Sequence, residues 1–283
     1  MKEINLRIKS ITGTKQITKA MELVAISKLT KAMDRTAKCR PFYTQLYSQL
    51  CDIASSSSAS DSVFCIKRPV KKICIIAIAG DRGLAGGYNN NLFKYCAELE
   101  NSREADCCIL PIGKRSLEHY KRRGYELISE DFACCEDVDV GDCYEISRLL
   151  TEMYTNGEFE ELYVVYTNFA SMLSQEPSSL RLLPLASQIN AKSDKKPAAK
   201  PFMLIEPSPS EVFAGIVPDS LAGLIWGAVC ESHSSELAAR RIAMENATSN
   251  AEDIIADLQL KYNKVRKSSI TQQITEIVSG SQE

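Results

Sequence analysis

The chain has 283 residues, of which 45% are hydrophobic and 25% charged, and its formal net charge is −2. These totals are ordinary for a globular protein of one or two domains and give no overall case for binding nucleic acid. No apolar run approaches the ~20 residues that a membrane-spanning helix needs, so any work at a membrane would depend on other subunits.

The charge is distributed unevenly along the sequence. Residues 1–40 carry ten Lys or Arg and three Asp or Glu, whereas residues 130–161 carry eleven Asp or Glu and a single Arg. Such asymmetry indicates partners with complementary surfaces, although a solvated helix face explains each segment equally simply.

The N-terminal segment, residues 1–58, is predicted to be a long coiled-coil helix. Gly13 is the only helix breaker in residues 1–40, and Pro41 predicts a kink or break. Apolar residues recur at the spacing of a coiled-coil seam, interrupted at Thr14 and Lys15. The predicted seam residues are Ile4, Ile8, Ile11, Ile17, Met21 and Val24.

The middle of the chain, residues 70–206, has the pattern of an inserted α/β domain with a Rossmann-like, mostly parallel sheet. Short apolar runs, typical of strands buried on both faces, alternate with helical stretches. The predicted strands are Ile73–Ala79, Cys107–Ile112, Tyr125–Ser129, Leu162–Thr167, Leu180–Leu185 and Phe202–Glu206, and the helices are 87–102, 114–123 and 142–156.

The C-terminal segment, residues 210–283, is predicted to be a second coiled-coil helix. Residues 228–279 contain no Pro and no Gly, a length that reaches roughly 78 Å as a helix. A helix of that length needs a partner, and the N-terminal segment of the same chain is the natural one. We therefore expect an antiparallel coiled coil of the two termini. Two sets of apolar residues in this segment are each predicted to share one face of the helix. They are Ile254, Leu258, Tyr262 and Val265, and then Ile270, Ile274 and Ile277.

A glycine-rich turn, Gly80–Asn89, follows the first predicted strand. Its glycines are spaced G-x-x-G-x-x-G-G, which departs from the G-x-G-x-x-G of dinucleotide-binding folds and lacks the G-K-[ST] of a P-loop. Asp81 would place a negative charge where a phosphate must bind. The sequence favours a structural turn capped by Asp81, with Arg82 available to a partner.

Catalytic and metal-binding constellations are not evident. His119 and His233 have no Cys, Asp or Glu at ligand spacing and are most simply surface residues. The eleven cysteines form no C-x-x-C pair, and with no secretory leader they are expected to be free thiols in a reducing cytosol. We expect no catalytic residue, no directly bound cofactor and no metal site.

Several blocks of sequence, in this order, resemble the gamma subunit of bacterial F-type ATP synthases. They lie at both ends of the chain and in the first strand–turn–helix: Ile8–Ile11, Gln16–Lys28, Asp81–Asn89, Ser235–Thr248, Leu258–Arg266 and Ile270–Ile277. Lys267, Gln273 and Gly80 depart from the residues usual in that family.

This resemblance implies a non-catalytic rotor shaft. In the family the coiled coil stands inside a ring of three alpha and three beta subunits, and the inserted domain contacts the epsilon subunit and the membrane ring of c subunits. ATP, ADP and Mg²⁺ bind to the alpha and beta subunits. Rotation driven by protons or sodium ions cycles the beta subunits through states that synthesise ATP, and ATP hydrolysis drives the reverse. The implied location is the cytoplasmic face of a bacterial cell membrane.

The resemblance also implies rotor–stator contact residues. By position these are Met21, Arg240, Arg266, Lys267, Thr271 and Gln272, and the matching turn includes Asp81, Arg82, Gly83, Gly86 and Asn89. We further expect that the basic side chains of Arg7, Lys9 and Lys19 meet carboxylates on the beta subunits.

Two other interpretations remain open at the level of sequence. A coiled-coil scaffold with an inserted domain explains the helices and the charge asymmetry but not the separate matching blocks. A nucleotide-dependent enzyme using the Gly80–Gly87 turn would bind ATP or NAD tightly as an isolated protein.

Overall fold

The computed structural model describes residues 1–54, 62–185 and 209–280, and its chain divides into two compact units. Unit 1 combines residues 1–27 with 240–283, and unit 2 is residues 28–239. Two long helices, α1 (Lys2–Ala54) and α5 (Pro209–Gly280), each pass from one unit into the other. The long terminal helices predicted from sequence are confirmed.

Unit 2 contains a five-stranded sheet in the order β3-β2-β1-β4-β5. The four strands β1 (Lys72–Ile78), β2 (Asp106–Ile112), β3 (Glu126–Leu127) and β4 (Glu161–Phe169) are parallel, and β5 (Gln175–Leu183) pairs antiparallel with β4. The predicted mostly parallel sheet is therefore confirmed. Its apolar strands lie at the centre, β1 between β2 and β4, where both faces are covered.

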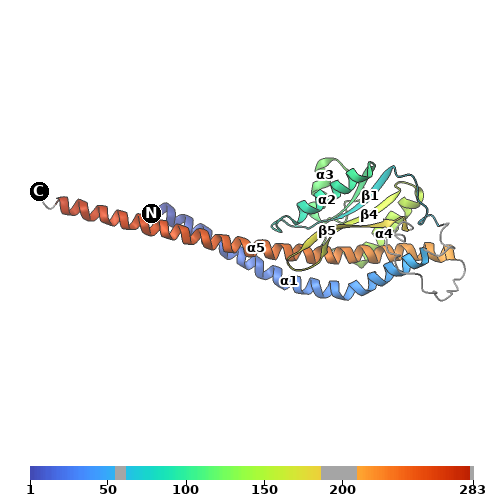
Figure 1. Cartoon of the computed structure of the whole chain (residues 1–283), viewed down its shortest axis with the longest axis horizontal. Helices are drawn as coiled ribbons and strands as arrows, with labels where there is room; N and C mark the ends of the chain where they lie inside the picture. The colour runs from blue at the N-terminus through green and yellow to red at the C-terminus, as the bar shows by residue number, and fades with distance from the viewer. Residues whose placement is uncertain (55–61, 186–208, 281–283) are drawn as a thin grey trace. The chain divides into compact units, whose positions relative to one another are not determined.

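Helices cover both faces of this sheet (Figure 1). On one face, α2 (Tyr88–Arg103) and α3 (Lys114–Arg123) pack against alternate residues of β1 such as Ile73 and Ile75. On the other face, α4 (Val140–Asn156) and the unit 2 part of α5 pack against the remaining alternate residues, including Cys74 and Ile76. This alternation is what a two-sided core requires of a strand.

Local signals in the sequence fix the ends of the shorter helices. Asp139 and Asp142 form a reciprocal capping box at the start of α4, each side chain accepting the other's backbone N–H. Gly124 and Gly157 end α3 and α4 in the left-handed conformation, which glycine adopts without a steric penalty.

Polar side chains join α1 to α5 within unit 2. The Glu231 carboxylate of α5 is buried and accepts hydrogen bonds from the Arg40 guanidinium and the Tyr43 hydroxyl of α1. Thr36 shares a 2.9 Å hydrogen bond with Ser234 and donates to the Cys230 carbonyl. These contacts link residues about 190 positions apart, so no local pattern could have predicted them.

Some predicted boundaries were wrong. The helix is not broken at Pro41, because α1 continues to Ala54. Tyr43 and Leu50, beyond the proline, pack against the core and offset the lost backbone hydrogen bond. The strand predicted over Leu180–Leu185 spans Gln175–Leu183 instead, since its first half is polar and lies at the sheet edge. The predicted strand Phe202–Glu206 lies outside the described residues.

Candidate functional site

In unit 1 the side of α1 that packs against α5 follows an unbroken heptad. Its members, each three or four residues after the last, are buried or half-buried: Ile4, Ile8, Ile11, Lys15, Thr18, Glu22 and Ala25. The facing positions of α5 have the same spacing: Met244, Thr248, Ala251, Ile255, Leu258 and Tyr262. This pairing is the antiparallel coiled coil expected from the sequence.

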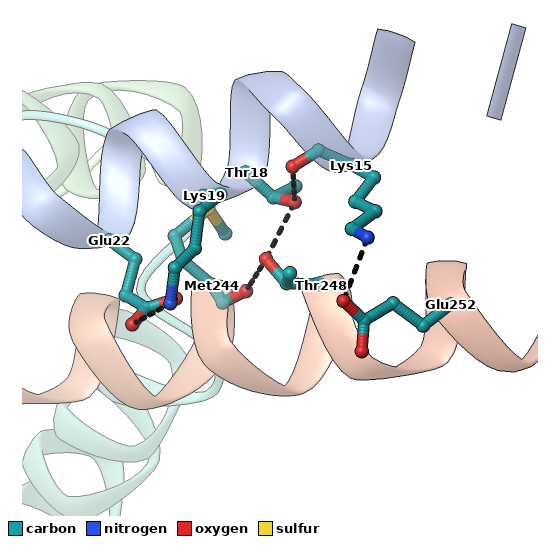
Figure 2. Close-up of polar contacts among 7 residues, drawn as sticks. All are labelled: Lys15, Thr18, Lys19, Glu22, Met244, Thr248 and Glu252. Atoms are coloured by element: carbon teal, nitrogen blue, oxygen red, sulfur yellow. Dashed lines mark hydrogen bonds and ion pairs between the residues drawn. The ribbon is translucent and has the colours of Figure 1, made fainter. Parts of the chain in front are cut away.

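The middle of this seam is polar (Figure 2). The Thr18 and Thr248 hydroxyls are 2.8 Å apart, and the Thr248 hydroxyl also lies 2.8 Å from the Met244 carbonyl of its own helix. Next to them, Lys15 forms a 2.8 Å ion pair with Glu252 across the two helices, and this pair lowers the pKa of the Glu252 carboxyl. Hydrogen bonds therefore replace apolar packing over this part of the seam.

Lys19, a predicted contact to a partner, instead contacts its own helix. Its ammonium group lies 2.9 and 3.1 Å from the two carboxylate oxygens of Glu22. Glu22 is only 6% exposed, because its position in the heptad turns it inward. Lys19 supplies the positive charge that a buried carboxylate needs.

The prediction that Ile17 and Val24 lie in the seam was wrong. Their exposed fractions are 63% and 57%, so both lie on the outside of α1 in unit 1. The sequence prediction followed hydrophobicity and moved one residue out of phase after Ile11. The actual seam keeps its heptad by accepting polar residues. Ile254 and Val265 of α5, also predicted to lie on a packed face, are 47% and 41% exposed.

The other predicted contact residues on α1 are accessible to different degrees. Arg7 and Lys9 are exposed, and Met21 is half-buried. On α5, Arg240 is half-buried, with interactions within the chain. The structure therefore leaves the Arg7 and Lys9 charges at the surface of unit 1, as a partner contact requires.

The C-terminal part of α5 carries the remaining predicted contacts. Arg266, Lys267, Thr271 and Gln272 are all exposed. The pairs Thr18–Thr248 and Lys15–Glu252 define an antiparallel register in which the first residue of the chain lies beside position 265 or 266. Figure 1 accordingly shows α5 running past the N-terminus. The turns from Arg266 onward therefore have no α1 segment to pair with.

The glycine-rich turn after β1 is organised around Asp81. Its carboxylate accepts hydrogen bonds from the backbone N–H groups of Lys114, Cys135 and Glu136, and Asn89 accepts one from the Gly80 N–H. This is the structural role expected of Asp81. These hydrogen bonds engage the Asp81 carboxylate with the protein's own backbone. The turn is therefore organised around an acidic side chain and not around a bound phosphate.

The neighbouring turn residues have distinct environments. Arg82 is exposed, Gly83 is half-buried and Gly86 is exposed with a φ of 58°. Gly80, which departs from the family, lies against a side chain of α5. A Cβ at this position would lie 2.6 Å from the buried Glu236 carboxyl group.

The histidines are not the surface residues predicted. Both are half-buried, and burial is the main cause that lowers the pKa of each. His119 stacks on Phe93 with ring centroids 3.8 Å apart. His233 is shielded in unit 2 near the ion pair of Lys28 and Glu136, an interaction between residues 108 positions apart that the sequence analysis missed.

The described part of the chain holds free thiols, without a metal cluster or a membrane-spanning helix. The ten cysteines described by the structure are free and are buried or half-buried. Burial raises the pKa of Cys134 to about 11 and that of Cys143 to about 12. Within residues 1–54, 62–185 and 209–280, no three His, Cys, Asp or Glu side chains are grouped to hold a metal ion. No helix in these ranges is long and apolar enough to cross a bilayer.

Comparison with known proteins decides the family. A family model described as ATP synthase matches residues 1–282. The ATP synthase gamma chain of Alkaliphilus metalliredigens is 41% identical over 283 residues, covering 100% of this chain and 98% of that protein. The chain belongs to the ATP synthase gamma chain family. The resemblance identified from the sequence blocks is thereby confirmed over the whole length.

Other relatives extend the comparison within the gamma chain family. The gamma chain of Ruminococcus albus is 39% identical, covering 99% of this chain and 97% of the relative. A gamma chain described as sodium ion specific, from Acetobacterium woodii, is 35% identical and covers 100% and 98%.

Solved structures share the fold. The Euglena gracilis mitochondrial ATP synthase, in its OSCP/F1/c-ring assembly, contains a chain that matches with a TM-score of 0.64 and 18% identity, covering 98% of this chain and 92% of that one. A chain of the Tetrahymena thermophila central stalk and c-ring matches with a TM-score of 0.60 and 21% identity, covering 82% and 99%. Long terminal helices with a central sheet are thus a fold that this chain shares with chains of these two assemblies.

Proposed function

We propose that this gamma chain is the central shaft of an F-type ATP synthase, coupling rotation of a membrane ring to the conformational cycle of the catalytic beta subunits. The observation that carries the proposal is the pairing of the two termini in unit 1, in a register that leaves no α1 segment beside α5 from Arg266 onward. A single helix that continues beyond its coiled-coil partner presents all its faces to surrounding subunits.

The asymmetry of unit 1 suits such a role. A shaft changes the conformations of its neighbours only if it contacts them differently in different orientations. Around unit 1 the surface alternates between exposed apolar residues such as Ile17 and exposed charges such as Arg7. The end of α5 has a different surface, in which apolar Ile270 and Ile274 lie among Ser, Thr and Gln.

The partners and location follow from this proposal. Three alpha and three beta subunits would surround the coiled coil and bind ATP, ADP and Mg²⁺, whereas unit 2 would contact the epsilon subunit and the ring of c subunits. The complex would lie at the cytoplasmic face of a bacterial membrane, driven by protons or by sodium ions. The sodium-specific relative supports testing both ions.

Contacts to the ring are proposed at exposed side chains. At the end of α5 these are Arg266, Lys267, Thr271 and Gln272, and on α1 they are Arg7 and Lys9, joined by the half-buried Met21. Arg240 is half-buried, and the part of its side chain that stays accessible would contact the ring of alpha and beta subunits. Lys19 is a weaker candidate than Arg7 or Lys9, because Glu22 already pairs with its ammonium group.

Reconstitution tests the shaft directly. The alpha and beta subunits are mixed with and without this chain, and steady-state ATP hydrolysis is measured, with a chain truncated after residue 265 as a second sample. We expect full activity only with the intact chain and weaker activation by the truncated one. A ring whose hydrolysis is the same with and without the chain would refute the shaft function.

The basic residues of α1 provide a finer test of coupling. Arg7→Gln and Lys9→Gln should each lower ion pumping per ATP hydrolysed in membrane vesicles severalfold, whereas Lys19→Gln should have a smaller effect. Lys38→Gln is the matched control, since Lys38 is an exposed α1 lysine paired with Asp34 in unit 2. Equal pumping in all four variants would show that these charges do not contact the ring.

A further inference from the structure

Six consecutive residues of α5 in unit 2, Glu231–Glu236, are polar, although this part of the helix is buried. The three serines of this run are at most 1% exposed and its two glutamates at most 5%. Ser and Glu are residue types that usually lie at protein surfaces. Burying a polar group costs free energy unless the group is hydrogen-bonded, so a run of this kind needs specific partners.

Ser232 and Ser235 find their partners in the sheet of unit 2. The Ser232 hydroxyl donates a 3.2 Å hydrogen bond to the Ile78 carbonyl at the end of β1. The Ser235 hydroxyl donates a 3.0 Å hydrogen bond to the Thr167 carbonyl of β4. A hydroxyl inside a helix can instead donate to the carbonyl one turn back, as that of Thr248 does. These two serines therefore join α5 to two neighbouring strands.

The segment that follows β1 is attached to the same part of α5. Tyr88, the first residue of α2, places its hydroxyl 2.7 Å from the Ser232 hydroxyl and 2.9 Å from the Ser232 carbonyl. The backbone of Gly80 lies so close to α5 that a Cβ there would be 2.6 Å from the Glu236 carboxyl group. Residues 232–236 thus contact the end of β1, the turn after it and the start of α2.

These contacts lie at the switch point of the sheet. β2 and β3 lie on one side of β1, β4 and β5 lie on the other, and the pairing of β1 with β4 ends at Ala77 and Val165. Ile78 and Thr167 follow that last pair. Open α/β sheets usually bind a ligand at this place, outside the carboxyl ends of the strands. In this chain, the hydroxyls of α5 bind the strand ends there.

The other residues of the polar run bind α1. Ser234 shares a 2.9 Å hydrogen bond with Thr36, and Glu231 accepts hydrogen bonds from Arg40 and Tyr43. At about 100° per residue, Ser234 and Glu231 occupy a different face of α5 from the two serines that bind the sheet. Hydrogen bonds therefore hold α5 to the sheet on one face and to α1 on another.

Hydrogen bonds restrain the angle of a helix about its axis more sharply than apolar contacts do. The hydrophobic effect is non-directional, so a small rotation of an apolar helix loses little of it. A hydrogen bond weakens steeply when its distance or angle changes. With Cα atoms about 2.3 Å from the axis, a rotation of about 30° moves each Cα by roughly 1.2 Å and its side chain further. Such a rotation would break both serine contacts.

We propose that Ser232 and Ser235 are positioning residues of the shaft, which fix the angle of α5 against the sheet so that torque passes between unit 2 and the part of α5 in unit 1. This inference rests on the proposed function, in which unit 2 contacts the ring of c subunits and unit 1 the beta subunits. Without the two hydroxyls, α5 twists against the sheet when the ring is under load.

Removing the hydroxyls tests this role in the complete complex, in membrane vesicles. Ser232→Ala and Ser235→Ala are made singly and together. ATP hydrolysis and the number of ions pumped per ATP are measured against an increasing opposing ion gradient, and the melting temperature of each chain is recorded. The matched control is Ser116→Ala. Ser116 is also buried, and its hydroxyl also donates to a carbonyl of β1, that of Ala77 at 2.8 Å, but it belongs to α3.

We expect the double variant to pump normally without a gradient, and to pump at least threefold fewer ions per ATP near the largest gradient that the unmodified complex sustains. Each single variant should lie between the two, so the comparison holds if the double variant does not assemble. Ser116→Ala should match the unmodified complex at every gradient, although its melting temperature falls by a similar amount. Dependence on load is the result that a purely stabilising role would not produce.

Two results would overturn the positioning role while leaving the shaft function intact. One is an equal number of ions per ATP in all variants at every gradient. The other is an equal loss in Ser116→Ala, which would indicate a general effect of removing a buried hydroxyl. Hydrolysis that is the same with and without the unmodified chain would overturn the shaft function, and this inference with it.

Discussion

Unit 2 and unit 1 are held together by different means. In unit 2, strand residues such as Ile73, Ile76 and Ile78 are completely buried between two layers of helices. In unit 1 the seam is occupied partly by Thr, Ala and Glu, and its buried residues in the described part of the chain include Glu22 and Thr248. Hydrophobic burial is the main stabilising term in folding, so unit 2 has its own core and unit 1 has little apolar surface to bury by itself.

This difference indicates that unit 2 provides most of the stability of the fold, whereas unit 1 provides surface for partners. A thin coiled coil with a polar seam keeps apolar residues such as Ile17 and Leu6 on its outside. Those residues become useful only in an assembly that covers them. We therefore expect changes in the core of unit 2 to unfold the protein, and changes in unit 1 to have small effects on the isolated chain.

Gly113→Ala should produce the largest loss of stability. Gly113 joins β2 to α3 with a φ of +94°, and a Cβ there would lie 2.2 Å from the Ala79 carbonyl oxygen. Backbone strain and overpacking together should lower the free energy of unfolding by about 3 kcal/mol or more, measured by thermal unfolding. Gly124→Ala is the control, since its φ is +73° but no atom lies within 4 Å of the added Cβ, and it should cost about 1 kcal/mol. Equal losses for both variants would show that the steric contact is unimportant.

Glu231→Gln should have the next largest effect. The buried carboxylate binds Arg40 and Tyr43, so a neutral amide weakens a charge-assisted contact between α1 and α5. We expect a loss of about 2 kcal/mol in urea unfolding, given that half of the Arg40 side chain is exposed to solvent. Glu98→Gln is the control, since it alters an exposed ion pair with Lys94 on α2, and it should leave the midpoint of urea unfolding unchanged.

Stability should fall as the pH is lowered from 7.5 to 5.5, because burial lowers the pKa of His119 and His233 below that of an unfolded histidine. Near His233, Glu136 and Asp81 oppose this shift, whereas Lys28 and Arg35 add to it. As the pH falls, the unfolded chain therefore binds protons at these histidines before the folded chain does. The stability is fully present above the pKa of an unfolded histidine and is lost as the pH falls below it. Each histidine contributes a slope of at most about 1.4 kcal/mol per pH unit. The double variant His119→Gln, His233→Gln should flatten the dependence of the melting temperature on pH. An unchanged slope would show that these two histidines do not cause the loss of stability at low pH.

The Thr18–Thr248 contact should have the smallest effect. Thr248→Val removes one hydroxyl, but the Thr18 hydroxyl also lies 3.0 Å from the Lys15 carbonyl of its own helix. We expect a loss of about 1 kcal/mol or less, with Thr18→Val and the double variant no worse than the single change. A double-mutant cycle in urea measures this, and strictly additive losses would mean that the two hydroxyls do not interact.

The sequence was sufficient for the elements that depend on local pattern. Continuous apolar runs predicted the central strands, and α3 was predicted with its observed bounds, because Gly124 ends the helix directly after a basic turn. The antiparallel termini followed from the long stretches without Pro or Gly. The contact residues proposed at the end of α5 rest on the family resemblance and remain predictions.

Other features depend on distant contacts and could not be predicted. The rotation of α1 in unit 1 is decided by Thr248 and Glu252, which lie more than 200 residues from their partners. Likewise, Pro41 and Pro218 remain inside helices because packing on both sides outweighs the local preference. The hydrophobic pattern of residues 14–24, taken alone, selects a face of α1 that is rotated by one residue, about 100°, from the one that is buried.

The distribution of thiols has a practical consequence. All eleven cysteines fall between positions 39 and 230, so unit 1 contains none. The ten described thiols are shielded, and those with pKa values raised to about 11 or 12, such as Cys134 and Cys143, hold little reactive thiolate at neutral pH. A cysteine placed at Ile17 would be alkylated much faster than these native ones. Unit 1 can therefore carry a fluorophore, a spin label or a bead while the ten described thiols of unit 2 stay in place.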